Sequence, residues 1–177
     1  MLVVMTVLLG IAYPLAITGI AQGLFKDRAD GSFVESNGSI VGSSLIGQPF
    51  EGEEWFAGRP DAYDPAASAP SNLGPSNPEL GAAVKERVEA ISAADAPGGS
   101  IPVDAVTGGG SGLDPHISPA YARLQAPRVA RARGLEVDQV LTLIDEQTEG
   151  RTFGFLGEPR VNVLLLNLAL EGLASQT

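Results

Sequence analysis

The single histidine of the chain lies in a run of residues that could perform hydrolysis. His116 is close in sequence to Asp114 and Ser111. A Ser-His-Asp hydrolase usually presents its serine on a Gly-x-Ser-x-Gly turn, and the run 109–113 lacks the second glycine. A zinc site normally needs three or four protein ligands, and the chain offers one histidine and no cysteine. We therefore expect the His116 ring to be fixed by hydrogen bonds to loop backbone. The alternative is a hydrolase or ligand-binding domain that uses Ser111, Asp114 and His116.

The segment Thr107–Gly112 is rich in glycine, and glycine-rich turns can cradle a phosphate with their backbone N–H groups. A P-loop would end in Gly-Lys-Ser or Gly-Lys-Thr, whereas Gly112 is followed by leucine and aspartate. A dinucleotide-binding turn would need its third glycine where Pro115 stands. We therefore expect a mobile or backbone-crowded turn, and no cofactor bound by this chain.

Opposite charges recur at close spacing near the C-terminal end, as Glu149 with Arg151 and as Glu158 with Arg160. Most such pairs lie on the surface and contribute little stability, but in a turn they can fix the shape of a loop. No two acidic residues stand out as a general acid and a general base. The absence of a convincing active site favours an accessory or structural subunit over an enzyme.

The overall charge narrows the class of partner. The 177 residues carry a formal net charge of -10, and every charged side chain follows Phe25. Such acidity argues against a nucleic-acid partner, because phosphates are bound by a basic face, and against a domain that lies flat on anionic lipid. The absence of cysteine excludes disulfides, thiolate metal sites and cysteine nucleophiles.

Residues 1–25 are uncharged and almost entirely apolar, which predicts a transmembrane helix. A helix rises about 1.5 Å per residue, so about 20 apolar residues cross the core of a bilayer. A cleaved signal peptide is the rival interpretation, because Ala21–Gly23 has the small-x-small pattern of a cleavage site. A signal peptide normally begins with basic residues and has a shorter apolar core, so the pattern favours a retained span.

Small residues on this helix predict that it packs against another protein helix. Gly19 and Gly23 lie one helical turn apart and would let a second backbone approach closely. Pro14 is expected to kink the helix, because it removes a backbone N–H. Lys26 and Arg28 follow the span, and the positive-inside rule would by itself weakly favour a cytoplasmic domain.

The rest of the chain predicts one domain of the α/β (α+β) class, with a small sheet and about four helices. Residues 26–38 are polar and turn-rich and predict a tether, so the domain is expected to span residues 39–177. Helix starts are predicted where a capping side chain precedes proline or an apolar run. The predicted helices are 78–95 capped by Asn77, 119–134 capped by Ser118 with a kink or break at Pro127, 137–150, and 163–173 capped by Asn162. The predicted strands are 39–46, 101–106 and 152–156, and residues 65–78 are expected to form a long loop.

Five runs of residues resemble, in order, the motifs of one protein family. They are Gly58–Pro60, Ser71–Pro78, Pro102–Thr107, Ser111–Pro119 and Gly154–Val163, and they follow a single N-terminal span. Together they resemble the C chain of the bacterial potassium-transporting ATPase, the KdpC family, over nearly the whole chain. Each run alone is weakly specific, whereas several long runs in the same order are highly specific. The candidate interface or loop-shaping residues are Gly19, Gly23, Arg59, Asn72, Asn77, Asp114, His116 and Arg160.

The resemblance implies a non-catalytic subunit of a high-affinity potassium pump in the cytoplasmic membrane. In that family a channel-like subunit binds potassium and a P-type ATPase subunit binds ATP, so ATP, Mg²⁺ and K⁺ belong to the complex rather than to this chain. The C chain is expected to hold these two subunits together, to contact membrane lipid, and to place its domain on the extracytoplasmic side. This topology overrides the weak charge signal after the span. A further expected role is at the potassium entrance.

Two departures from the family pattern carry structural expectations. The family usually begins its third helix with a serine or another good cap, whereas this chain has Leu135 and Glu136, so the start of that helix is expected to fray. Residues 108–110 are all glycine, which predicts a more flexible loop than the family norm.

Overall fold

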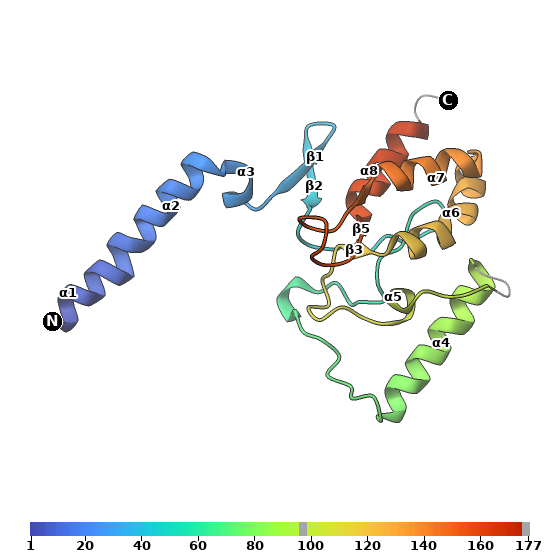
Figure 1. The fold of residues 1–177 in the computed structure, drawn as a ribbon, viewed down its shortest axis with the longest axis horizontal. Helices are drawn as coiled ribbons and strands as arrows, with labels where there is room; N and C mark the ends of the chain where they lie inside the picture. Colours follow the sequence, from blue (N-terminus) through green and yellow to red (C-terminus); the bar gives the residue numbers. More distant parts are fainter. Residues whose placement is uncertain (96–98, 175–177) are drawn as a thin grey trace. The chain divides into compact units, whose positions relative to one another are not determined.

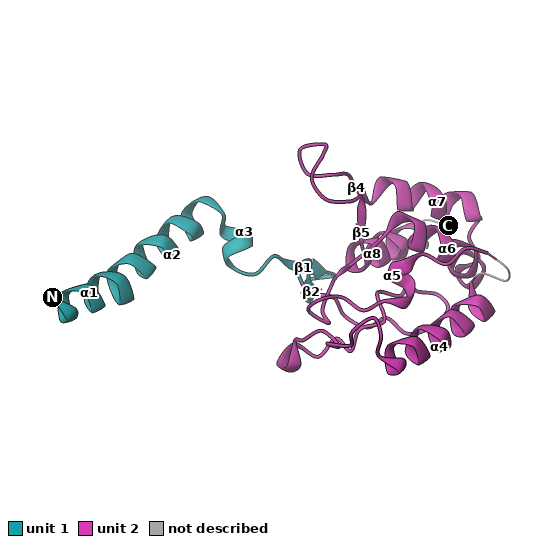
Figure 2. Ribbon diagram, turned by 60° about the horizontal axis from the view of Figure 1, so that its bottom comes forward, with its two compact units in different colours: residues 1–45 teal, residues 46–177 magenta. Residues whose placement is uncertain are grey.

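The computed structural model describes residues 1–95 and 99–174, and the chain separates into two compact units, residues 1–45 and 46–177 (Figure 2). Mixed helix and strand content confirms the predicted fold class (Figure 1).

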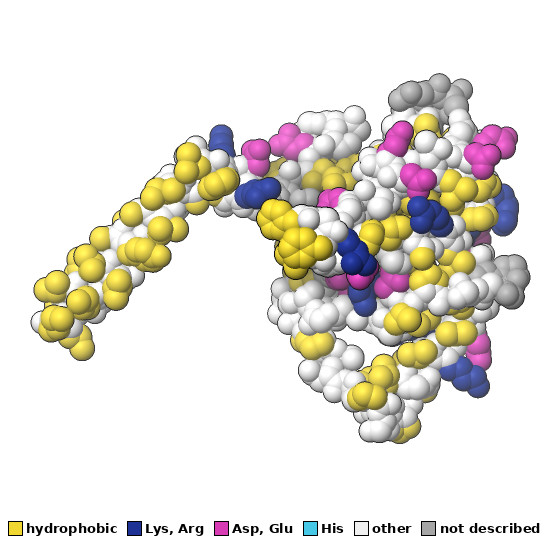
Figure 3. Space-filling model, viewed as in Figure 1, with side chains coloured by type: hydrophobic (Ala, Val, Ile, Leu, Met, Phe, Trp, Pro, Cys, Tyr) yellow, Lys and Arg dark blue, Asp and Glu magenta, His cyan; other side chains and the backbone are white. Residues whose placement is uncertain are grey.

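The first unit begins with an apolar helix long enough to cross a membrane. It comprises α1 (Leu2–Val7), the π-helical η1 (Leu8–Ala12) and α2 (Tyr13–Leu24), with a mean hydropathy of 2.1 and no buried residue. Hydrophobic side chains cover it along its length in Figure 3. The Tyr13 N–H donates to the carbonyl of Leu8, five residues back. This wider turn directly precedes Pro14, which has no N–H to donate, and the expected kink at Pro14 stays a prediction.

A short helix and a hairpin complete the first unit. α3 (Lys26–Ala29) is followed by β1 (Phe33–Ser36) and β2 (Ser39–Ser43), which pair antiparallel. Residues 26–38, expected to be a tether, therefore contain a helix and one strand of this hairpin. The missed signal was Asn37-Gly38, whose positive φ angles of 53° and 77° form the tight turn that joins two strands. The predicted strand 39–46 ends at Ser43.

The second unit combines helices with a small antiparallel sheet in the order β3-β5-β4. Its elements are η2 (Pro65–Ala67), α4 (Pro78–Ala94), α5 (Val103–Val106), β3 (His116–Ile117), α6 (Pro119–Arg133), α7 (Val137–Glu146), β4 (Thr148–Glu149), β5 (Arg160–Asn162) and α8 (Val163–Ala174). The central strand β5 places Val161 opposite Ile117 on one side and opposite Thr148 on the other. The expected long loop 65–78 is irregular apart from η2.

Capping side chains begin the helices as predicted. Asn77 accepts a hydrogen bond from the Glu79 N–H, and Ser118 accepts one from the Tyr121 N–H. Asn162 accepts one from the Leu165 N–H at the start of α8. Each cap satisfies an N–H that the first helical turn would otherwise leave unpaired.

Three local predictions are wrong. Residues 101–106 form no strand: a single helical turn, α5, buries both Ala105 and Val106, which alternation along a strand would place on opposite faces. α6 runs through Pro127 without a break, with Ala126 and Val129 on either side fully buried in the core, and the alternative expectation of a kink there stays a prediction. The start of α7 is not frayed, because Glu136 and Gln139 form a reciprocal capping box.

The third wrong prediction concerns the segment after α7. The helix ends at Glu146 rather than at Gly150, because the next two residues pair with β5 as β4. Residues 152–156 contain one bridge between Thr152 and Leu156 instead of a strand. Positive φ angles at Phe153 (54°) and Gly154 (82°) close this bridge into a tight turn.

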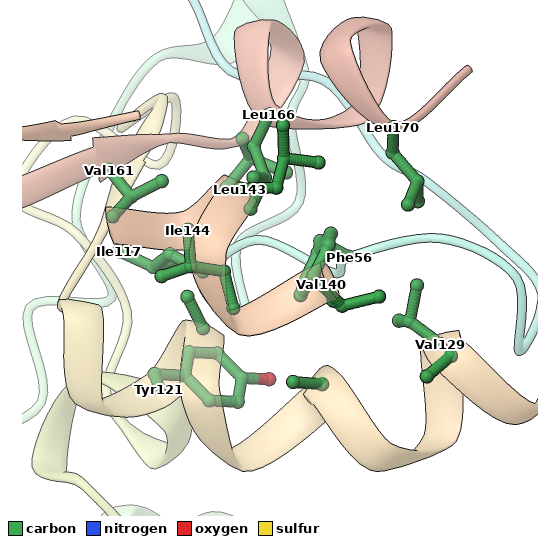
Figure 4. Packing of buried hydrophobic residues seen from close by; sticks show 14 of the residues in the cluster. Phe56, Ile117, Tyr121, Val129, Val140, Leu143, Ile144, Val161, Leu166 and Leu170 are labelled. Carbon is green, nitrogen blue, oxygen red and sulfur yellow. The ribbon is translucent and has the colours of Figure 1, made fainter. Parts of the chain in front are cut away.

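The core lies between α6, α7, α8 and the extended segment around Phe56 (Figure 4). Phe56 is fully buried although it belongs to no helix or strand. Its N–H donates to Asn167 Oδ1 (2.9 Å), and the Asn167 side-chain amide donates to its carbonyl (3.0 Å). Gln125 makes the same two bonds with the backbone of Ala57, at 2.8 and 3.1 Å. Two buried amides thus pair with this backbone as a neighbouring strand would.

Arginine side chains of α6 hold the residues before Phe56. Arg128 donates to the carbonyls of Glu53 (2.6 Å) and Trp55 (3.1 Å) and forms a largely buried ion pair with Asp95 (2.6 Å). The Arg133 guanidinium lies 4.1 Å from the centre of the Trp55 ring. These contacts fix the segment 53–57 along α6, and Asp95 attaches the end of α4 to the same helix.

We call the bonds of Gln125 and Asn167 to the backbone of Phe56 and Ala57 the amide clamp. Truncation of Gln125 tests its contribution to stability. Gln125→Ala would leave the buried backbone N–H of Ala57 without its acceptor, so the free energy of unfolding should fall by about 1–3 kcal/mol. Urea unfolding in detergent, followed by the fluorescence of Trp55, the only tryptophan, measures the change. Gln139→Ala is the control, because it removes an amide that bonds the exposed Glu136 N–H at the start of α7, which water can replace, and it should cost less. Equal losses in the free energy of unfolding for the two variants would show that the Gln125 bonds contribute no more than an exposed hydrogen bond.

Candidate functional site

A polar cleft of about 430 Å³ in the second unit gathers residues from four of the five sequence motifs. Its lining residues are Arg59, Val103, Asp104, Thr107, Asp114, His116, Ile117, Ser118, Glu158, Pro159 and Arg160. The sequence runs that carry the family resemblance, apart from Ser71–Pro78, therefore meet at one place.

Arg59 joins three segments at this cleft. Its guanidinium donates to the carbonyls of Thr107 (3.1 and 3.2 Å) and Gly108 (3.2 Å), and it lies 3.5 Å from Asp114 Oδ2. The carbonyls belong to the C-terminal end of α5, where helices leave carbonyl groups unpaired. Arg59 is therefore positioned to fix the entry of the glycine-rich loop.

Asp114 organises the turn before β3. Its Oδ1 accepts a hydrogen bond from the backbone N–H of His116 (3.0 Å) and lies 3.5 Å from Nδ1 of the same residue. The His116 ring, the His116 N–H and the Arg59 guanidinium hold the pKa of Asp114 below its usual value, against the opposing effect of burial. The expectation that the His116 ring bonds to loop backbone is wrong in its partner, because the ring contacts this carboxylate.

Asp104 fixes the start of α6 from the other side of the cleft. Its carboxylate accepts hydrogen bonds from the Ser118 N–H (2.6 Å) and the Ser118 hydroxyl (2.9 Å). The same hydroxyl oxygen accepts from the Tyr121 N–H and so caps the helix. The cap is therefore held in place by a carboxylate that comes from α5.

The charged residues near the C-terminal end pair across the loop rather than within each run. Arg151 lies 2.6 Å from Glu158, and Arg160 lies 2.7 Å from Glu149. Both ion pairs bridge the two sides of the segment between β4 and β5. They link the two sides of this loop at its surface, and the expectation that they fix its shape stays a prediction.

The glycine-rich loop is crowded by the protein itself. Asp61 Oδ1 accepts a hydrogen bond from the Gly109 N–H (2.8 Å), which places a carboxylate where a phosphate would bind. A Cβ atom at Gly108 would lie 2.7 Å from Asp61 Oδ1, so a larger residue there would displace the Asp61 carboxylate. The turn is crowded at Gly108 and Gly109 as expected, but by the Asp61 carboxylate rather than by backbone, and Asp61 had no recognisable signal in the sequence.

The residues of the alternative hydrolase are not assembled into a triad. The Ser111 hydroxyl accepts a hydrogen bond from the Leu113 N–H (3.1 Å), and Ser111 is not among the residues that line the cleft with His116. Asp114 already contacts Arg59 as well as His116. Within residues 1–95 and 99–174, no group of three or more His, Cys, Asp and Glu side chains could hold a metal ion.

The other candidate residues lie outside the cleft. Asn72 is exposed in the long loop with a φ of 57°, and Asn77 caps α4. A Cβ atom added to Gly19 or Gly23 would meet no atom within 4 Å, so the surface of α2 is open at both positions. Whether any of these residues contacts a partner stays a prediction.

The architecture is that of a membrane-associated protein with one N-terminal apolar helix and a small helix-and-sheet unit. A family model described as "K+-transporting ATPase, c chain" matches residues 1–172. Similar proteins are potassium-transporting ATPase KdpC subunits. The one from Sorangium cellulosum is 57% identical over 97% of this chain and 94% of its own length. The one from Methylococcus capsulatus is 54% identical over 98% of this chain and 94% of its own length. The chain belongs to the KdpC family of potassium-transporting ATPase subunits.

The lowered pKa of Asp114 predicts a pH dependence of stability. A depressed folded-state pKa contributes stability above the unfolded value of 3.8, and this contribution is lost as pH falls through the folded value. Asp114→Asn should therefore cost about 1 kcal/mol at neutral pH, allowing for screening at a half-buried site. The stability lost in Asp114→Asn should approach zero at a pH below both the folded and the unfolded pKa of Asp114.

Urea unfolding at several pH values measures this difference. Glu146→Gln, on the exposed end of α7, is the control and should show little change at any pH. A cost of Asp114→Asn that is constant from neutral to acid pH would contradict the electrostatic role of the carboxylate.

Proposed function

We propose that this chain is a non-catalytic accessory subunit that holds together the channel-like potassium-binding subunit and the P-type ATPase subunit of its pump. One observation carries the proposal: the apolar helix Leu2–Leu24 has no buried residue in the chain alone. Its apolar surface is suited to lipid on some faces and to other helices on the rest.

The helix offers a specific face for packing. Gly19 and Gly23 are separated by one turn of α2, and the space above each is empty within 4 Å of an added Cβ. In a membrane, helices associate mainly through close van der Waals packing, which small residues permit. The two glycines therefore form a shallow groove into which a helix of another subunit would fit.

The chemistry of the cleft supports a non-catalytic role. Its carboxylates and guanidinium groups contact one another or the backbone: Asp104 binds Ser118, Asp114 binds His116, and Arg59 binds Thr107. Such fully engaged groups stabilise a fold and leave no acid or base ready for proton transfer. In this proposal ATP, Mg²⁺ and K⁺ bind to the other subunits.

The proposal places the chain in the cytoplasmic membrane as a single-pass protein whose second unit is extracytoplasmic. The resemblance to the family supports this side, whereas Lys26 and Arg28 after the span favour the opposite one by charge alone. The net charge of -10 beyond the span would raise the local concentration of cations near a potassium entrance. A diffuse field of this kind cannot distinguish potassium from sodium.

Enlarging the two glycines tests the packing face. Gly19→Leu and Gly23→Leu together should keep the helix in the membrane but fill the groove, so this chain should no longer co-purify with the two larger subunits. Ile17→Leu with Ile20→Leu is the control, because it changes shape without filling the groove. Wild-type recovery of the complex with the double leucine variant would refute the packing role.

A further inference from the structure

The loop 150–159, between β4 and β5, exposes two aromatic rings on an ordered scaffold. We call it the aromatic loop; it stands out from the second unit beside β4 and β5 in Figure 2. The side chains of Phe153 and Phe155 are 85% and 69% exposed, and Leu156 is 49% exposed. Apolar surface of this size is unfavourable in water and marks an interaction site when it is contiguous.

Hydrogen bonds hold the tip of the aromatic loop in one shape. Thr152 and Leu156 exchange two backbone hydrogen bonds of 2.9 Å, and the Gly154 N–H donates to the carbonyl of Arg151 (3.0 Å). Phe153 has a φ of 54°, a conformation that bulky residues rarely adopt. The backbone thus accepts strain at the residue whose ring is most exposed, a pattern typical of binding loops.

The base of the loop is fixed to the core. The ion pairs Arg151–Glu158 and Glu149–Arg160 join its two sides. The chain then enters β5, where Val161 is fully buried between β3 and β4, and Asn162 caps α8. The tip of the aromatic loop is therefore connected to the sheet at both of its ends.

We propose that the aromatic loop is a docking element, which inserts Phe153 and Phe155 into an apolar pocket on another subunit of the same pump. The inference rests on the proposed function, because it requires assembly with those subunits. It adds a second point of attachment, separate from the packing face on α2.

Charge favours a protein pocket over a lipid surface. The two arginines and two glutamates of the loop base pair with one another, so the region offers balanced charge rather than a cationic patch for anionic headgroups. Insertion into lipid does not require a loop of defined shape. Binding to a protein pocket is stronger when the tip is already ordered in its bound shape, because less conformational entropy is lost.

Area and charge argue against a second copy of this chain. A stable dimer buries about 800 Å² on each partner, while an aromatic side chain buries about 150–250 Å². Phe153, Phe155 and Leu156 fall short of that area, and two copies that each carry a net charge of -10 repel. Two aromatic anchors in a pocket instead match the centre of a larger interface.

Photo-crosslinking in the complete pump identifies the occupant. Benzoyl-phenylalanine would replace Phe153 in one preparation and, as control, the exposed Ala82 on α4 in another. After irradiation of native membranes, Phe153 should yield an adduct with another pump subunit, several-fold above the control. Adducts only with lipid, adducts only with a second copy, or a yield equal to that of Ala82 in an assembled pump would each overturn the proposal.

A companion variant separates this inference from the proposed function. Phe153→Ser with Phe155→Ser keeps the glycines and both ion pairs, so the loop should retain its shape. The pump should still assemble through the span but should lose this chain about tenfold faster on dilution in detergent, as expected when central anchors are removed. An unchanged rate would overturn the docking role and leave the proposed function standing, whereas failure of the wild-type chain to co-purify would refute the proposed function itself.

Discussion

The second unit depends on the pairing of two buried side-chain amides with the backbone of Phe56 and Ala57. Gln125 on α6 and Asn167 on α8 supply both the donors and the acceptors that a neighbouring strand would supply. The extended segment can therefore be buried without unpaired polar groups, and the Phe56 ring fills the centre of the core. The segment continues directly into Gly58 and Arg59. The clamp therefore also fixes the position of the Arg59 backbone, from which the guanidinium extends to Thr107 and Asp114.

Arg59 connects the clamped segment to the cleft. It holds the end of α5, and Asp104 on the same short helix holds the cap of α6. The motifs that meet at the cleft thus form a chain of contacts from the core to the helix starts, and each polar group is used in shaping the unit. The aromatic loop differs, because backbone hydrogen bonds order a tip whose rings are exposed to solvent.

Features that depend on local chemistry could be predicted from the sequence. Asn77, Ser118 and Asn162 announce helix starts because a cap bonds to backbone only two or three residues away. The clamp could not be predicted, since Gln125 and Asn167 bind residues 68 and 111 positions away along the chain. The opposite charges near the C-terminal end predicted a loop of fixed shape. Which acid pairs with which arginine depends on the pairing of β4 with β5, which brings the two sides of the loop together. The segment 101–106 has the composition of a strand, but burial of the adjacent Ala105 and Val106 against the core goes with a helical turn, and this tertiary contact could not be predicted from the segment alone.

We propose that the polar cleft shapes the subunit and performs no chemistry. ATP turnover per assembled pump, measured with Asp114→Asn and His116→Gln combined in this chain, tests it most directly. Both replacements keep hydrogen-bonding groups but remove the charge and the titratable ring. The account predicts a less stable second unit and a turnover per assembled complex equal to that of the wild type. Loss of turnover in a fully assembled pump whose second unit unfolds at the wild-type urea concentration would contradict it.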